Sequence, residues 1–495
     1  MTPRPRPTGR PPDPPPERAR EQAHEQAHEL AHEPAARWPP PPRLLRFGVE
    51  EEFLLTARRS RTTVPAAAAV VADAARTLGT RAQHEFLATQ VEVCTRPVAT
   101  AAELRDELAL GRAVLVAAAE RAQARLTASG TAVLPSRHPL PVSAGRRYQQ
   151  IASMVNGIAD QVGAEICGCH VHLGDLTLTQ SLCLSARLRA WLPIVQSFCA
   201  NSPFCEGIDR GTAAIRPERY ARWPTCGPAP VLDPHGYRTA MDRMVEDGVI
   251  LDRRMLYWYA RPSEHLPTLE VRVADTSADL DTALLLAVLL RGLAHTLLDP
   301  RTRVRPIADL ALRLAHRAAA EAGLAAELPD PHTGELRPVR QLLPEAVEFA
   351  APALARTHDL TLARHLTGHL LAHGSGADRQ RAALARHGHL SAVVDDLTHR
   401  TAAAAPATRR SGHGPIHVSA HLPVHVWVHV SVRAPRAYAW PCCCSDLPAC
   451  TPCRGTPRCC WTCWAANPCA PAPAAWTWGR DAARSPWPPP GAGAG

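Results

Sequence analysis

The stretch FGVEEEFLL, residues 47–55, places three consecutive glutamates inside an apolar run. Successive side chains of a β-strand point to opposite faces, so residues two apart share a face. Glu50 and Glu52 then face one way, while Val49, Glu51 and Phe53 face the other. The stretch therefore predicts a strand with one face directed at a core and one acidic face.

Three further segments repeat this division into an apolar face and a polar face. Their polar residues are Gln90 and Glu92 in TQVEV (89–93), His170 and His172 in CHVHLG (169–174), and Glu270 and Arg272 in TLEVRVADT (268–276). An antiparallel sheet with one solvated face also alternates in this way. Four strands that use carboxylate, imidazole and guanidinium almost exclusively favour a functional site.

The surrounding sequence alternates strands with helices rich in alanine and leucine from about residue 43 to 403. Helical periodicity fits about 65–79, 101–128, 145–163, 178–199, 235–249, 279–297 and 306–322, with shorter helices after 340. Strand patterns fit 46–55, 87–94, 166–173 and 267–274. The sequence predicts one folded unit over residues 43–403, in which strands alternate with helices.

The two ends of the chain have a different composition. Residues 1–42 are rich in proline and are expected to be a disordered extension. Residues 404–495 form a tail rich in Cys, Pro and Trp that holds nine of the 16 cysteines. Its C-x-x-C pairs at 450–453 and 460–463 leave a metal knuckle open. The short spacer between the pairs favours an unstructured tail.

The net charge of +9 is uneven along the 495 residues. Residues 405–495 hold eight Arg and two Asp, which gives +6 and leaves +3 for the rest, so nucleic-acid binding is not expected. All 55 basic residues are arginine, which excludes a Walker A lysine and a Schiff base. No run of about 18 apolar residues is found, so no membrane span and a cytoplasmic location are expected.

The chemistry of the polar strand faces narrows the class of reaction. Clustered carboxylates repel one another unless a hard divalent cation lies between them, and Mg²⁺ accepts carboxylate oxygens. Arginine and imidazole beside them suit the oxygens of a phosphate. A sheet that offers both, in a chain without a P-loop, points to ATP-dependent ligation.

Seven motifs, taken in order, resemble those of the carboxylate–amine ligases of the glutamate–cysteine ligase type 2 family. They are FGVEEEFLL, TQVEV, GCHVHLG, ANSPF, RWPTCGP, GVILDRRMLYWYARPS and TLEVRVAD. The resemblance covers about residues 44–403. It implies that residues 43–403 are one catalytic domain of the α+β class with a glutamine-synthetase-like fold, in which helices pack on one face of a curved antiparallel sheet. It also implies an enzyme that uses ATP to phosphorylate a carboxylate, expected to be glutamate, and joins it to an amine, expected to be cysteine.

The resemblance also implies roles for particular residues. The expected Mg²⁺ ligands are Glu50, Glu52, Glu92 and Glu270. The expected catalytic and nucleotide-facing groups are His170, His172 and Arg272, the last as counter-charge for the transferring phosphoryl group. The expected substrate residues are Arg147, Tyr148, Arg216, Arg222, Trp223, Tyr257 and Arg261, although several of the arginines also fit an ordinary surface role.

Other functions stay open at this level. In a metal-dependent hydrolase, His170 and His172 would bind Zn²⁺ with Glu92 or Asp275. In a non-catalytic protein, the cysteine-rich tail would carry the function. Two departures from the family pattern, TAAI at 212–215 and Cys205, leave the physiological substrates open. Amino acids are the expected small-molecule partners, and a homodimer is left open.

Overall fold

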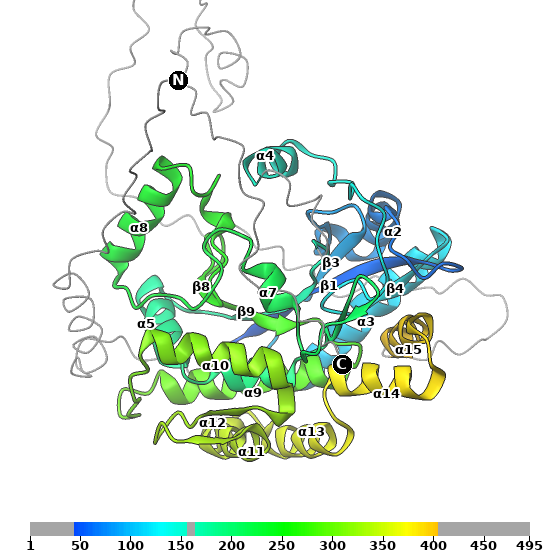
Figure 1. Cartoon of the computed structure of the whole chain (residues 1–495). Helices are drawn as coiled ribbons and strands as arrows, with labels where there is room; N and C mark the ends of the chain where they lie inside the picture. The colour runs from blue at the N-terminus through cyan, green and yellow to red at the C-terminus, as the bar shows by residue number, and fades with distance from the viewer. Residues whose placement is uncertain (1–43, 156–163, 404–495) are drawn as a thin grey trace, which may run out of the picture. The chain divides into compact units, whose positions relative to one another are not determined.

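A seven-stranded antiparallel sheet carries the four predicted strands side by side. The computed structural model describes residues 44–155 and 164–403 (Figure 1). The sheet runs in the order β2-β3-β1-β5-β9-β8, and β4 also pairs with β1. Its strands are β1 (Phe47–Ala57), β2 (Ala82–His84), β3 (Gln90–Cys94), β4 (Ala124–Thr127), β5 (Gly168–Leu173), β8 (Ala260–Pro262) and β9 (Leu269–Asp275). Two small hairpins are β6 (Phe204–Cys205) with β7 (Ile208–Asp209), and β10 (Glu327–Pro329) with β11 (Leu336–Pro338).

The register of this sheet places the polar residues of neighbouring strands opposite one another. Glu52 is paired with Glu92 across β1 and β3. Glu50 is paired with His170 across β1 and β5, and His172 with Glu270 across β5 and β9. Directly opposite residues of an antiparallel pair project to the same face, so the polar positions form one continuous surface. The predicted α+β class with an antiparallel sheet is confirmed.

Helices supply the second layer of the fold. Those before β9 are α2 (Ala67–Leu78), α3 (Ala101–Arg121), α4 (Arg146–Met154), α5 (Leu178–Leu188), α6 (Leu192–Phe198), α7 (Arg216–Tyr220) and α8 (Pro234–Glu246). Those after it are α9 (Leu280–Leu297), α10 (Asp309–Ala322), α11 (Val339–Phe349), α12 (Ala351–Arg356), α13 (Leu360–His373), α14 (Gly376–His387) and α15 (Leu390–Ala403). Figure 1 shows α9 and α10 running below the sheet, with α11 to α13 as a further layer beneath them.

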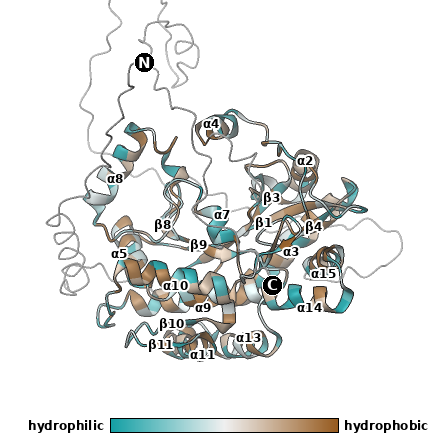
Figure 2. Ribbon diagram, in the orientation of Figure 1, coloured by the Kyte–Doolittle hydropathy of each residue, from teal (hydrophilic) through white to brown (hydrophobic). Residues whose placement is uncertain are grey.

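The apolar face of the sheet packs against α3, α5, α6 and α9. Side chains such as Val49 and Val171 join the leucines of α9 in one buried cluster, and α9 carries the hydrophobic colouring of Figure 2. This helix, Leu280–Leu297, is long and apolar enough to cross a membrane, yet 89% of it is buried inside the protein. A helix buried on all sides in this way is the centre of a globular core.

Three predicted helices are wrong in their extent. The helix predicted over 101–128 ends at Arg121, because Gln123 adopts a positive φ of 58° and the chain turns back into β4. The helix predicted over 178–199 is broken between Leu188 and Leu192 into α5 and α6. The helix predicted over 145–163 ends at Met154, where Val155 leaves the helical conformation, and residues 156–163 lie outside the described residues. The predicted extensions over 1–42 and 404–495 also lie outside them.

Candidate active site

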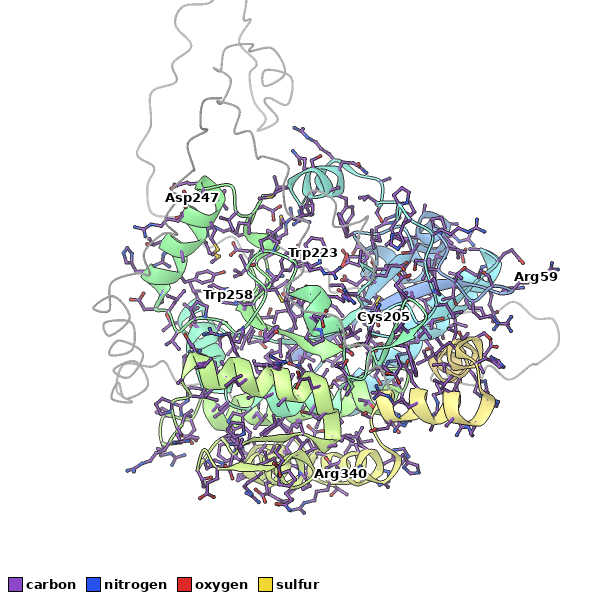
Figure 3. The ribbon with its side chains drawn as sticks, in the orientation of Figure 1. Arg59, Cys205, Trp223, Asp247, Trp258 and Arg340 are labelled. Carbon is purple, nitrogen blue, oxygen red and sulfur yellow. The ribbon has the colours of Figure 1, made fainter. Side chains whose placement is uncertain are left out.

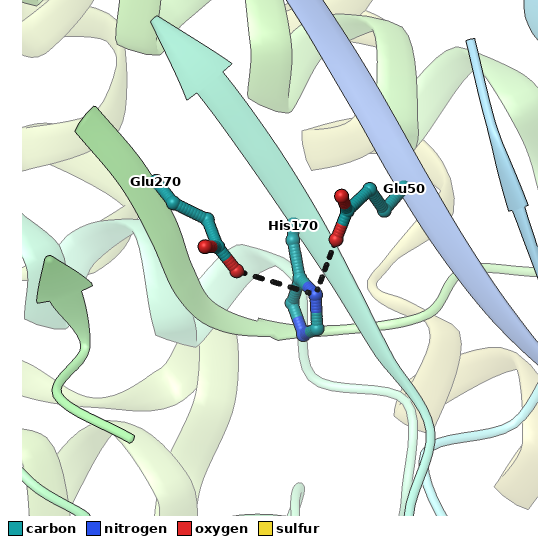
Figure 4. Close-up of side chains that lie close together, drawn as sticks. All are labelled: Glu50, His170 and Glu270. Atoms are coloured by element: carbon teal, nitrogen blue, oxygen red, sulfur yellow. Dashed lines mark hydrogen bonds and ion pairs between the residues drawn. The ribbon is translucent and has the colours of Figure 1, made fainter. Parts of the chain in front are cut away.

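Four of the predicted acids and both histidines meet on the polar face of the sheet. His170 Nδ1 lies 3.3 Å from an oxygen of Glu50 and 3.8 Å from one of Glu270, as Figure 4 shows. The Nε2 atom of the same ring lies 3.6 Å from Glu52. His172 Nε2 lies 3.1 Å from Glu50. One imidazole therefore contacts carboxylates from two neighbouring strands.

The acids of this surface differ in their electrostatic state. Burial would raise the pKa of Glu50, but His172 and His170 hold it well below its ordinary value. Burial, followed by the charges of Glu50 and Glu85, raises the pKa of Glu92 well above its ordinary value. The pKa of Glu85 is raised to about 7 by burial and by Glu52. Glu85 and Glu92 therefore lack enough nearby positive charge, whereas the charge of Glu50 beside them is compensated by two histidines.

Glu270 lies on the arginine side of this surface. Arg261 Nη2 forms an ion pair with one of its oxygens at 2.9 Å, and Arg272 donates to the other oxygen. Although burial opposes ionisation, these two arginines lower the pKa of Glu270 to about 2. Arg272 also donates through Nε to the hydroxyl of Tyr220 at 3.3 Å. Arg272 is thus held from two sides, with its guanidinium next to the acids.

A cavity of about 160 Å³ opens over the polar face between β3, β9, α4 and α7. Its acids are Glu52 and Glu85, and its arginines are Arg147, Arg216, Arg254 and Arg272. Five aromatic side chains form much of the remaining wall: Phe86, Tyr148, Tyr220, Trp223 and Tyr257. Figure 3 shows Trp223 in the space between α4 and α7. The cavity thus offers acids, cations and an aromatic wall within one small volume.

The aromatic wall is continuous because its rings contact one another. Trp223 packs edge-on against Phe86 and Tyr257, with ring centroids 5.2 and 5.3 Å apart. Tyr257 in turn contacts Tyr220 at 5.7 Å. Edge-to-face contacts of this kind stabilise the rings beyond the area that they bury. The wall is therefore preformed.

Arg216 enters the cavity over a glycine. A Cβ added at Gly168 would overlap the Arg216 guanidinium and would lie 2.9 Å from His170 Nε2. Arg216 also lies 4.0 Å from a carboxylate oxygen of Asp275 and 5.0 Å from the ring centre of Tyr220. Its Nε atom is buried and has no hydrogen-bond partner among the described residues. This guanidinium is therefore placed to receive a carboxylate.

The remaining predicted substrate residues have different surroundings. Arg147 lines the cavity but holds Asp252 with two hydrogen bonds of 2.8 and 2.9 Å. Tyr148 lines it as well and donates to the carbonyl oxygen of His84. Arg222 is exposed and is not part of the lining, and Arg261 lies with Glu270 outside it. The structure brings together five of the seven predicted substrate residues, and Arg222 and Arg261 are not among them.

Sequence reasoning missed Glu85 and Tyr220. Glu85 follows the three-residue strand β2, which is too short to show an alternation. Tyr220 ends the five-residue helix α7. In each case the residue reaches the cavity through tertiary packing and not through a pattern of its own strand. The nearby motifs ANSPF and RWPTCGP were the available signals, since they bracket α7.

A larger cavity, about 460 Å³, lies among α3, α9, α13, α14 and α15. Its cations already have partners, because Arg379 and Arg400 both contact Asp279 and Arg105 contacts Asp281. None of the predicted site residues lines it. Size alone therefore does not identify the functional site, whereas the convergence of acids, histidines and arginines does.

Comparisons with known proteins agree with this geometry. Residues 46–396 match the family described as "Glutamate-cysteine ligase family 2 (GCS2)". A Saccharopolyspora erythraea protein named "Putative glutamate–cysteine ligase 2-1" is 40% identical over 355 residues, which are 71% of this chain and 94% of that protein. A Salinispora tropica protein named "Putative glutamate–cysteine ligase 2" is 37% identical and covers 73% of this chain and 97% of its own length.

Two solved structures share the fold at low sequence identity. A Francisella tularensis glutamate–cysteine ligase in complex with AMP has a TM-score of 0.57 and 10% identity, over 74% of this chain and 90% of that one. A bifunctional glutathione synthetase from Pasteurella multocida has a TM-score of 0.53 and 13% identity, over 77% and 54%. These likenesses confirm the fold class that the resemblance implied. The family match gives no support to the alternative hydrolase.

Proposed function

Since the chain belongs to the glutamate–cysteine ligase family 2, we propose that the polar face of its sheet joins the side-chain carboxylate of glutamate to the amine of cysteine. The enzyme is an ATP-dependent ligase. In such a reaction the terminal phosphoryl group of ATP passes to the carboxylate, and the amine then displaces phosphate to give an amide. The observation that carries this proposal is the convergence of acids, histidines and arginines from β1, β3, β5 and β9 on one face of the sheet, beside a cavity lined by Glu52, Arg216 and Arg272.

The acids fit divalent cations. In the part of the chain that the structure describes, three sets of ligand atoms lie within 4.8 Å of one another, and two of these sets combine glutamates with His170. Their members are Glu50, His170 and Glu270 in one set, and Glu52, Glu92 and His170 in the other. Burial and the charges of neighbouring acids raise the pKa of Glu92, and a divalent cation between these acids would favour its ionised form. When bound, Mg²⁺ would neutralise the phosphate oxygens of the nucleotide.

Arg272 and the two histidines would act on the phosphates. Arg272 is fixed by Glu270 and Tyr220, so its guanidinium needs little reorganisation to face a transferring phosphoryl group. Burial and the charge of Arg272 lower the pKa of His170 to about 4, so this ring is neutral at physiological pH. A neutral imidazole can accept a cation or donate one hydrogen bond to a phosphate oxygen.

Arg216 would hold the carboxylate-bearing substrate. It is buried, its Nε atom is free among the described groups, and Gly168 leaves room for it against β5. The aromatic wall of Trp223, Tyr257 and Phe86 would exclude water from the activated carboxylate and pack against the acceptor amine. Since Arg222 and Arg261 do not line the cavity, any contact that they make with a substrate lies outside it.

The test is the dependence of ADP formation on both substrates. The purified full chain is incubated with ATP and Mg²⁺, and with glutamate and cysteine singly and together. ADP, phosphate and an amide product of the expected mass should form only with the pair, and EDTA should abolish all three. ADP formation that ignores the amine, or absence of ATP binding with Mg²⁺ present, would refute the proposal.

A second experiment identifies the amine that reacts with the activated carboxylate. Replacing cysteine with other amino acids and small amines, one at a time, should reveal the preferred amine by its kcat/KM. A preference for an amine other than cysteine would keep the ligase and change only its acceptor. The cytoplasmic location and a homodimer remain predictions.

A further inference from the structure

Beneath the acid surface, a buried ion pair occupies the apolar face of the same strand. Glu51 lies between Glu50 and Glu52 but points to the opposite side, and it is fully buried. Arg112 of α3, also fully buried, donates to both its oxygens, through Nε at 3.0 Å and through Nη2 at 2.5 Å. The alternation of β1 therefore places a clamped carboxylate between two acids of the polar face, Glu50 and Glu52.

Arg112 also binds the connection between β9 and α9. Its Nη1 donates to the carbonyl oxygen of Ala278 at 2.9 Å, and its Nη2 donates to that of Ser277 at 2.8 Å. This connection begins at Asp275, which lies 4.0 Å from Arg216 and accepts from Ser202 Oγ at 2.6 Å. The guanidinium of Arg112 thus joins β1, which carries the acids, to the segment that follows Asp275. Asp275 in turn contacts Arg216.

The fold alone gives no reason for a charged pair at this place. The neighbouring side chains of the same layer are apolar, as with Val49 and Val93. A buried ion pair is often no more stabilising than an apolar pair of similar volume, because both charges lose their hydration. What the pair adds is direction, since a bidentate guanidinium fixes the orientation of the carboxylate and its strand.

We propose that Arg112, through its bonds to Glu51 and to the Ser277 and Ala278 carbonyls, is a positioning residue for the metal-binding acids. It sets the orientation of Glu50 and Glu52 on the polar face and fixes their distance from the segment that follows Asp275. This inference rests on the proposed function, because it concerns the site for the divalent ion. Arg112 touches neither substrate nor cation and acts through the strand.

Metal binding without turnover tests this role. Mn²⁺ binding to the full chain is measured by electron paramagnetic resonance or calorimetry, well below the unfolding temperature of each variant. The variants are Arg112→Lys, Arg112→Met and the double variant Glu51→Leu/Arg112→Met. Lysine keeps the charge but not the bidentate fork or the carbonyl bonds. Groups that orient metal ligands typically contribute about 10- to 100-fold to metal affinity.

We expect Mn²⁺ affinity to fall by at least about tenfold in all three variants. The double variant should unfold at a higher temperature than Arg112→Met, because it leaves no carboxylate buried without a partner. Its affinity for Mn²⁺ should nevertheless remain low. Stability and affinity would then separate, which a merely structural pair would not produce.

A second buried pair provides the matched control. Arg291 of α9 binds Asp359 and the Ala99 carbonyl, and its guanidinium stacks on Phe47 of β1, 3.9 Å from the ring centre. Replacing Arg291 and Asp359 by Met and Leu should leave Mn²⁺ affinity unchanged. Folded Arg112 variants that bind Mn²⁺ within about twofold of the wild type would overturn the inference alone. A wild-type chain that binds no Mn²⁺ would overturn the proposed function as well.

Discussion

Glu92 is the acid whose charge is least compensated. Its pKa is raised well above the ordinary value by burial and by Glu50, Glu85 and Glu52, so ionisation of Glu92 opposes folding at pH values above the unfolded pKa of about 4.3. Replacement by glutamine should therefore raise the free energy of unfolding at pH 7.5 in EDTA, by on the order of 1 kcal/mol. Urea unfolding of wild type and Glu92→Gln measures this difference.

The same substitution should lower ligase turnover by at least about 100-fold, because an electrostatic group of the site is lost. Glu107→Gln is the matched control, since Glu107 is a buried acid of α3 that pairs with Arg81 and Arg96 instead. It should lose stability and keep turnover. A Glu92→Gln variant that is both less stable and fully active would assign Glu92 a structural role.

The variant Tyr220→Phe tests whether turnover depends on the hydrogen bond between Tyr220 and Arg272. Tyr220→Phe removes the hydroxyl that accepts from Arg272 Nε and keeps the ring beside Arg216 and Tyr257. A single hydrogen bond of this kind contributes about 1 kcal/mol, so kcat should fall by about fivefold with little change in the KM for glutamate. Steady-state kinetics measure both constants. A raised KM with unchanged kcat would instead make Tyr220 a substrate contact.

At the scale of secondary structure, the long strands were predictable and the short ones were not. β1, β5 and β9 each span six or more residues, enough for an alternation of faces to show. β2, β4 and β8 have three or four residues, and their pairing is decided by neighbours that are distant in the sequence. The turn at Gln123 that ends α3 could not be predicted from the sequence either, because glutamine seldom adopts a positive φ.

Gly168, the first residue of β5, leaves the space that the guanidinium of Arg216 occupies. Gly168 lies two residues before His170, and a methyl group there would collide with the guanidinium of Arg216. Gly168→Ala should therefore displace Arg216 and raise the KM for glutamate by about tenfold. Because the same methyl group would lie 2.9 Å from His170 Nε2, Mn²⁺ affinity should fall as well. Kinetics and Mn²⁺ titration together check this. An unchanged KM for glutamate would remove Arg216 from the substrate site.

At the scale of the whole molecule, the sequence predicted the acid surface but not the cavity above it. Alternation places Glu50 and Glu52 on one face without reference to other elements. The aromatic wall requires α4 and the segment after α7 to approach the sheet, and no local pattern encodes that approach. Arg112 illustrates the same limit, because its partners lie 61 and 166 residues away along the chain.

Two buried histidines make the stability of the whole molecule depend on pH. Burial lowers the pKa of His295 to about 4 and that of His316 to about 3. Below pH 6.5 these two histidines therefore bind protons in the unfolded chain but stay neutral in the folded chain. The free energy of unfolding consequently decreases as the pH falls toward 4. Each proton changes the unfolding free energy by about 1.4 kcal/mol per pH unit. Unfolding temperatures between pH 8 and 5 should decline less steeply for His316→Gln, and an unchanged slope would contradict this assignment.

The boundary of the catalytic domain should lie just after α15. Val393, Val394 and Leu397 of this helix are buried in the cluster that also holds Phe53 and Leu126 of the sheet. A chain of residues 43–403 should therefore keep the kcat of the full chain and unfold within about 2 °C of it, since a change of 1 kcal/mol shifts the unfolding temperature by about 2–4 °C in domains of about 150–250 residues and by less in larger ones.

A chain cut at residue 388 is the matched comparison. It loses α15, exposes that cluster to water and removes Thr401, whose hydroxyl accepts from the Ala128 amide at 3.1 Å. Uncovering several fully buried aliphatic side chains costs about 1.5–3 kcal/mol each, so this shorter chain should aggregate or unfold at room temperature. Circular dichroism, gel filtration and ADP formation compare the three chains. Loss of activity in residues 43–403 with an intact fold would give the segment after 403 a part in catalysis that the proposed site does not require.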